Sequence, residues 1–226
     1  MDDRDALWAK LAELREKLGT ISPGITMEYP CSSVFEASSS NVVAELDQCV
    51  TGLRLLLETV DSPLSHNERR DLLENVRLTL EHTHQLALAQ PTTLDQIHQS
   101  LTHIYAVIGY QSSTRQELEY DLATTQALID NLPNSEERCF SVFQNEANSL
   151  PDEFRYCVDF LYAVIHAPSS EISYHERPSF VAEVEQSLEH TRYFVVTNPS
   201  FGIIHQRIKQ LCEIIRIYLE NNFHVT

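Results

Sequence analysis

The sequence has few glycines, few lysines and no long apolar run. Only 5 of its 226 residues are glycine, and they are isolated from one another. Nucleophile elbows and phosphate-binding loops need closely spaced glycines so that the backbone can approach a substrate, and neither motif is present. The apolar runs are too short to span a membrane, and the acidic start does not resemble a signal peptide. We therefore expect a cytosolic protein.

Basic residues are also scarce. The chain has 33 acidic and 16 basic side chains and a formal net charge of −17. Nucleic-acid phosphates would be repelled, and no basic stripe offers an exception, so no nucleic-acid partner is expected. The acidity serves solubility or attracts a basic protein. The only lysines are Lys10, Lys17 and Lys209, which fits either a biased genome or avoidance of ubiquitin attachment.

The cysteines are few and unpaired in their spacing. Cys31, Cys49, Cys139, Cys157 and Cys212 are odd in number and never form a Cys-x-x-Cys pair. This pattern favours reduced core thiols over a disulfide framework or a zinc site.

Helical periodicity, in contrast, is present almost throughout. In the most apolar segment, 198–223, the residues Ile204, Ile208, Leu211 and Ile215 recur at spacings of three and four. Apolar residues cover most of this helix, so other helices must surround it. Capping residues and prolines define the further helices 3–18, 40–60, 65–89, 91–110, 113–131, 135–149, 151–166 and 178–196.

These helices predict an all-α fold, either an antiparallel multi-helix bundle or stacked helical hairpins. The expectation is about nine helices, with the C-terminal helix central. The 34-residue register of tetratricopeptide repeats is not found. The predicted organisation is an N-terminal amphipathic helix (1–18), a linker or arm (19–39) and a helical body (40–226).

The N-terminal segments carry the predicted partner surface. A helix as short as 3–18 is marginal alone in water, so its apolar stripe must dock on its own body, on a second copy or on a partner. Aromatic and apolar anchors dominate interface energies, and an extended arm is a common recognition element. The predicted partner-binding residues are Leu7, Trp8, Leu11, Leu14, Tyr29 and Phe35.

The metal hypotheses are weaker. Glu81 with His84, and Asp95 with His98, have the Glu-x-x-His type of spacing that binds metals in helical bundles. Both histidines flank the apolar stripes, however, which favours a cluster at the solvent edge without a metal. No cofactor is expected.

The sequence therefore favours a non-enzymatic adaptor or scaffold of the cytosol that binds another protein through a helical groove and its N-terminal helix. Homodimer formation through that helix is a variant of this hypothesis. One alternative is an acidic inhibitor or immunity-type protein that neutralises a basic enzyme. A second alternative is a metal-dependent helical hydrolase.

Overall fold

Several helices begin at a polar side chain that accepts a hydrogen bond from the first turn. In the computed structural model, Asn41, Ser65, Thr114 and Ser149 each cap a helix in this way. At Ser65 the sequence predicts a capping box with Glu68, and this is confirmed, because the Glu68 carboxylate accepts from the Ser65 backbone N–H at 2.7 Å. Each cap is worth about 1 kcal/mol, so the caps determine where helices start.

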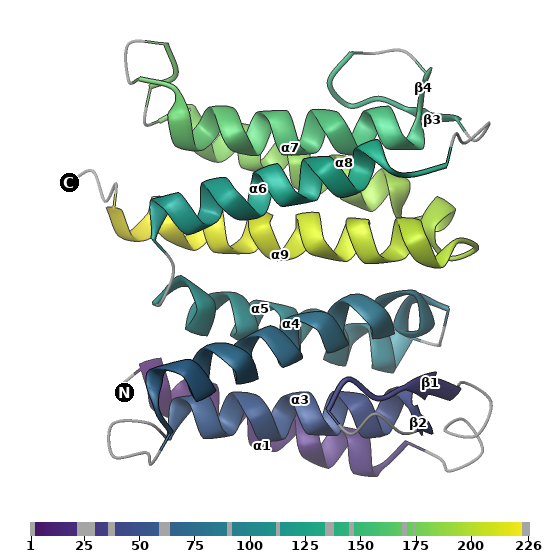
Figure 1. The fold of residues 1–226 in the computed structure, drawn as a ribbon, viewed down its shortest axis with the longest axis vertical. Helices are drawn as coiled ribbons and strands as arrows, with labels where there is room; N and C mark the ends of the chain where they lie inside the picture. Colours follow the sequence, from purple (N-terminus) through teal and green to yellow (C-terminus); the bar gives the residue numbers. More distant parts are fainter. Residues whose placement is uncertain are drawn as a thin grey trace. The chain divides into compact units, whose positions relative to one another are not determined.

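The structure describes residues 3–21, 30–35, 39–58, 64–89, 92–111, 114–133, 138–144, 147–168, 171–173 and 175–222. These residues contain eight α-helices and four short strands, which confirms the all-α prediction and comes close to the expected nine helices (Figure 1). None of the described helices has the length and apolar character needed to cross a bilayer. The chain divides into two compact units, Met1–Ile108 and Gly109–Thr226, and this boundary differs from the predicted ones after residues 18 and 39.

Unit 1 is a helix, a β-hairpin and three further helices. Its elements are α1 (Asp3–Gly19), β1 (Pro30–Ser32), β2 (Ser39–Asn41), α3 (Val42–Leu57), α4 (His66–Leu88) and α5 (Thr92–Tyr110), the last of which runs past the unit boundary. Helix α3 contacts α1, α4 and the hairpin, and it therefore forms the middle of the packing (Figure 1).

Unit 2 repeats this order. Its elements are α6 (Arg115–Asp130), β3 (Arg138–Phe140), β4 (Ala147–Ser149), α7 (Leu150–His166), α8 (Arg177–Val195) and α9 (Pro199–Asn222). Helix α9 contacts α6, α7 and α8, as expected for a helix that is apolar over most of its circumference. Burying each of its isoleucines and leucines contributes about 1.5–3 kcal/mol.

The predicted helix over residues 135–149 is wrong, because the described part of this segment forms the hairpin β3–β4. The strands pair antiparallel, with Cys139 opposite Asn148. Cys139 is buried while its strand neighbours Arg138 and Phe140 are exposed, which is the two-residue alternation of a strand and not a helical stripe. Ser149 caps α7 and so cannot continue a preceding helix.

The predicted linker 19–39 also contains structure. Strands β1 and β2 pair antiparallel, with Cys31 opposite Ser40. The backbone N–H of Val34, beyond β1, donates to the Glu45 carboxylate of α3 at 3.3 Å. This bond ties the hairpin to the helix that follows it, so the end of the predicted arm belongs to the folded body of unit 1.

The two units are copies of one module in sequence as well as in order. Identical residues recur 108 positions apart in the hairpins and in the helices that follow them. Cys31, Ser33, Val34, Phe35, Glu45, Cys49, Val50 and Leu53 match Cys139, Ser141, Val142, Phe143, Glu153, Cys157, Val158 and Leu161. The chain is therefore an internal tandem repeat, which a search for tetratricopeptide spacing alone does not detect.

The outer helices match with small shifts in spacing. In the last helix the offset is 107: His98 and His205 each donate from Nε2 to a carbonyl at 2.8 Å, and the carbonyls belong to the matched residues Leu80 and Leu188. In the first helix the offset is 111, where the same four-three-four spacing recurs. There Leu7, Leu11, Leu14 and Leu18 match Leu118, Leu122, Thr125 and Ile129.

Candidate functional site: the cleft between α1 and α5

Helix α1 docks on its own chain. Leu11 and Leu14 are 0% and 1% exposed, and α1 packs on α3. The guanidinium of Arg15 reinforces this contact by bonding Asp47 at 2.9 Å and the Thr51 hydroxyl at 2.5 Å. Of the alternatives that the sequence left open, the structure shows intramolecular docking, so Leu11 and Leu14 serve the core of unit 1.

The other predicted partner residues have different environments. Leu7 and Trp8 are half-buried on α1, and Phe35 is half-buried in the turn after β1. The Trp8 ring is covered on one side by Arg54, whose guanidinium carbon lies 4.8 Å from the ring centroid. Tyr29 lies outside the described residues. The structure therefore leaves parts of Leu7, Trp8 and Phe35 accessible to a partner.

A cleft of about 520 Å³ lies between α1 and α5. This volume is within the usual range for ligand sites. The lining residues are Lys10, Leu14, Lys17, Thr93, Gln96, Ile97, Gln99 and Ser100. Leu14 and Ile97 are buried and form the apolar floor, while polar side chains form the walls.

Two lysines of the cleft share one carboxylate. Lys10 Nζ lies 3.0 Å from one oxygen of Glu13, and Lys17 Nζ lies 2.5 Å from the other. The hydrogen bonds from Lys17 and Lys10 lower the pKa of Glu13. All three side chains are 42–49% exposed, so water screens these ion pairs and they hold the lysines only weakly.

Unit 2 is bridged at the matching place. Arg207 of α9 donates from Nε to the Thr125 hydroxyl of α6 at 3.0 Å. By the repeat offsets, Arg207 matches Ser100 and Thr125 matches Leu14, and both of these unit 1 residues line the cleft. The Ser100 hydroxyl donates to the Gln96 carbonyl of its own helix at 2.9 Å. Arg207, which joins two helices in unit 2, is thus replaced in unit 1 by the shorter Ser100, which bonds only to its own helix.

The two histidines of the metal hypothesis do come together. The rings of His84 and His98 have centroids 5.2 Å apart. The predicted position at the solvent edge is wrong, because both histidines are buried where α4 meets α5. His98 uses Nε2 to donate to the carbonyl of Leu80, which turns that nitrogen away from metal ligation.

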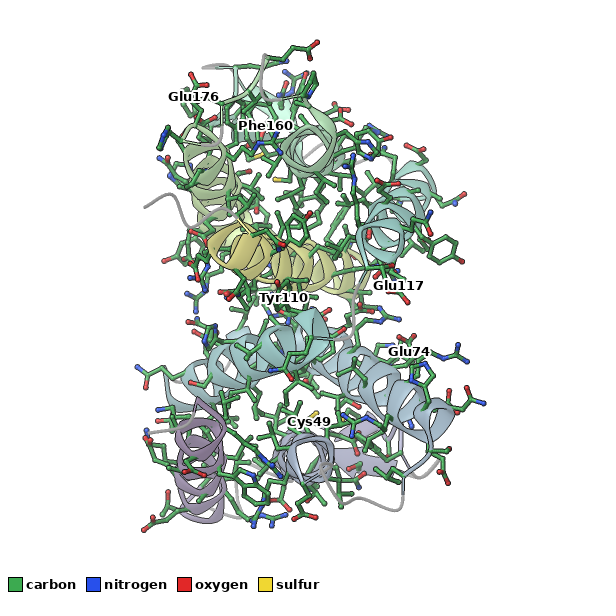
Figure 2. The ribbon with its side chains drawn as sticks, turned by 90° about the vertical axis from the view of Figure 1, so that its left-hand side faces the viewer. Cys49, Glu74, Tyr110, Glu117, Phe160 and Glu176 are labelled. Carbon is green, nitrogen blue, oxygen red and sulfur yellow. The ribbon has the colours of Figure 1, made fainter. Side chains whose placement is uncertain are left out.

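The two carboxylates of the hypothesis are engaged elsewhere and are also buried. Glu81 forms an ion pair with Arg77, and Asp95 accepts from the Gln99 amide at 2.9 Å. Arg77 also binds Glu74, which extends outward from α4 (Figure 2). Among the residues that the structure describes, no group of three or more His, Cys, Asp or Glu side chains could hold a metal ion.

A buried polar network in unit 2 was not predicted. The Glu153 carboxylate accepts from the Ser187 hydroxyl at 2.7 Å and from the backbone N–H of Val142 at 3.3 Å. Cys157 donates to the same hydroxyl at 3.4 Å. Burial raises the pKa of Cys157 to about 12, so at neutral pH this thiol is not a nucleophile.

Unit 1 has the matching buried carboxylate. Glu45 is 1% exposed and accepts from Val34, as Glu153 does from Val142. The thiol of Cys49 points into the space enclosed by the helices of unit 1 (Figure 2), and burial raises its pKa. These groups connect each hairpin to its core. The repeated Glu and Cys positions were the sequence signal that could have revealed them.

The arrangement as a whole offers a polar cleft, with buried thiols and carboxylates that serve the packing. Comparisons of the chain with protein-family models, with curated proteins and with solved structures found no match.

Proposed function

We propose that the protein is a non-enzymatic interaction module of the cytosol that binds a segment of another protein in the α1–α5 cleft. The observation that carries this proposal is that the cleft is open in unit 1, whereas Arg207 joins the matching helices in unit 2. The packing of the module does not require an opening at this place, because unit 2 forms the same module with Arg207 joining the two helices. The N-terminal helix supplies one wall, and of its predicted partner-binding residues Leu14 lines the cleft.

The cytosolic assignment is supported by the thiols. All five cysteines are free, and four of them are buried. Free thiols are typical of reducing compartments.

The test is to block the cleft without changing charge. Ser100→Trp would fill the space between the helices, and Ala127→Trp, at an exposed position on α6, is the matched control. Both variants and the natural protein would be used for affinity purification from extracts, followed by mass spectrometry. We expect a defined partner that is captured by the natural protein and the control and is lost with Ser100→Trp. Equal capture by all three would refute the cleft as the binding site.

A second candidate is an inhibitor of a basic enzyme, which the net charge of −17 favours. Such a complex would depend on long-range attraction, so its affinity should fall steeply between about 0.05 M and 0.5 M salt. Binding in the cleft involves few charges and should depend on salt much less. Measuring the affinity of the captured partner across this range distinguishes the two functions.

A further inference from the structure

The chemistry of the cleft differs from that of the rest of the chain. Acidic residues outnumber basic ones 33 to 16, yet the residues that line the cleft include two lysines and no acid. These are two of the three lysines in the protein. The remaining polar groups of the walls are hydroxyls and amides. The Ser100 hydroxyl and one Gln99 N–H already donate to Gln96 and Asp95, which leaves Thr93, Gln96 and the second Gln99 N–H to donate to an anion.

The fold does not require these lysines. By the offset of the first helices, Lys10 matches Asp121 and Lys17 matches Leu128, so unit 2 builds the same module with an acid and an apolar residue there. Helix α1 holds to α3 through its leucines and Arg15, and neither lysine takes part in those contacts. The positive charge therefore belongs to the cleft and not to the packing.

The positions of the lysines define what fits. Lys10 and Lys17 are two helical turns apart, about 10 Å along the axis of α1, and Leu14 lies between them on the same face. A chain in the extended polyproline II conformation covers nearly the same distance in three residues, at about 3.1 Å per residue, and its side chains three positions apart lie on one face. Two carboxylates spaced as Glu-x-x-Glu would reach both ammonium groups.

An incoming carboxylate would replace Glu13, which now bridges both lysines. Because this ion pair is exposed, exchanging one carboxylate for another changes little in the solvation of the lysines. The walls would then add hydrogen bonds that Glu13 does not receive.

We propose that the occupant of the cleft is an extended acidic segment of a partner protein, with two carboxylates bound by Lys10 and Lys17. This inference rests on the proposed function and specifies the chemistry of its partner. Charge complementarity carries it, since a positive cleft on a strongly acidic protein selects against the basic segments that the rest of the surface would attract.

The first test uses a fluorescent peptide containing Glu-Leu-Ser-Glu, flanked by glycine and serine, and a control peptide with lysine in place of both glutamates. Fluorescence anisotropy with the full chain should show binding of the acidic peptide only. Replacing both lysines (Lys10→Gln with Lys17→Gln) should weaken that binding about tenfold. Lys209→Gln, the matched control on α9, should leave it unchanged.

A second variant tests whether a carboxylate supplied by the protein itself competes with the acidic peptide for the lysines. Ser100→Glu places a carboxylate in the cleft, where it would pair with the lysines and compete with the peptide, whereas Ser100→Gln would not. Circular dichroism would establish that each variant keeps its helices. No binding of the acidic peptide, equal binding of the basic peptide, or no effect of the double lysine replacement would each overturn the inference.

The outcomes for the two proposals are separable. Loss of the captured partner with Ser100→Trp, together with full retention by the double lysine variant, would keep the cleft as the site and remove the acidic segment. Retention of the partner with Ser100→Trp would remove the proposed function itself.

Discussion

Unit 1 and unit 2 fill one position of the same module in opposite ways. Gly52 of α3 matches Phe160 of α7. A Cβ at Gly52 would lie 3.1 Å from Val76 and 3.2 Å from Leu72, so α4 approaches α3 closely there. In unit 2 the Phe160 ring, labelled in Figure 2, packs instead between Phe143 and Phe180, with centroids 4.4 and 5.4 Å away.

This difference shows which parts of the module vary between the units and which are the same in both. The side-chain contacts between neighbouring helices differ at this position, whereas the buried Glu45 and Glu153 each accept a hydrogen bond from the hairpin in the same way in both units. Close packing makes either solution stable as long as volume is conserved locally. Four predictions test how far this equivalence extends.

The largest effect is expected at the core position occupied by Leu46 in unit 1 and Phe154 in unit 2. Phe154 is 0% exposed and packs edge-on against Phe201 and His205. Phe154→Ala should lower the free energy of unfolding by about 3–5 kcal/mol, because it leaves a cavity. Phe154→Leu copies the other unit and should cost less than half as much. Urea denaturation followed by circular dichroism measures both, and equal losses would show that the units do not share a packing template.

The second largest effect is a loss of stability at acidic pH, caused by His205. Burial, and to a smaller extent Lys209 and Arg192, lower the pKa of His205 to about 4, although its bond to Leu188 opposes this. The unfolded chain takes up this proton near pH 6.5, so stability is complete above that pH and is lost as the pH falls toward 4. The loss should reach about 3 kcal/mol.

His205→Gln keeps a donor for the Leu188 carbonyl and removes the titration. Its unfolding free energy, measured between pH 7 and pH 4.5, should change less with pH than that of the natural protein. Parallel curves would contradict the assignment to His205. The same substitution at His98, the matching residue, shows whether unit 1 shares this sensitivity.

A third effect is expected at the buried carboxylates. Glu153→Ala leaves the Val142 N–H and the Ser187 hydroxyl without their acceptor, which should cost about 2 kcal/mol. Glu45→Ala should cost a similar amount through Val34. Hydrogen exchange at Val142 and Val34 provides the specific measurement, since each variant should accelerate exchange in its own hairpin only.

The smallest effect is at two glycines in helices. Gly109→Ala should stabilise the protein by up to about 1 kcal/mol, because the nearest atom would be 3.8 Å away and alanine favours helix. At Gly52 the same gain is offset by crowding against Val76 and Leu72, so Gly52→Ala should be neutral or destabilise by about 1 kcal/mol. Thermal melting of the two variants compares them directly. An increase in stability at Gly52 equal to that at Gly109 would mean that Val76 and Leu72 of α4 move aside without cost.

The helices and much of the core were predictable from the sequence. The apolar residues that recur at helical spacing on α5 are buried, as are those on the α9 stripe from Ile204 to Ile215. Periodicity is a local signal, and most of these helices are long enough to display it. The residues of this spacing on α5 are Leu94, Ile97, Leu101, Ile104 and Ile108.

The hairpins and the cleft were not predictable in the same way. Each strand has three residues, too few for a pattern, and each hairpin depends on an acceptor from a later helix, such as Glu153. The cleft arises from how α1 meets α5, which no local pattern encodes. The repeat was visible in principle, but its identical residues are sparse and lie far apart in the sequence.

The contrast between Ser100 and Arg207 has a consequence for how such a chain changes over time. Two side chains of each unit, Ser100 and Leu14 against Arg207 and Thr125, separate the open helix pair of unit 1 from the joined pair of unit 2, so the two copies of the module have diverged at this place. Doubling a module lets one copy change at such a place while the other keeps its link. Arg207→Ser removes the link between α6 and α9 and is therefore the substitution that brings unit 2 nearest to unit 1 at this place.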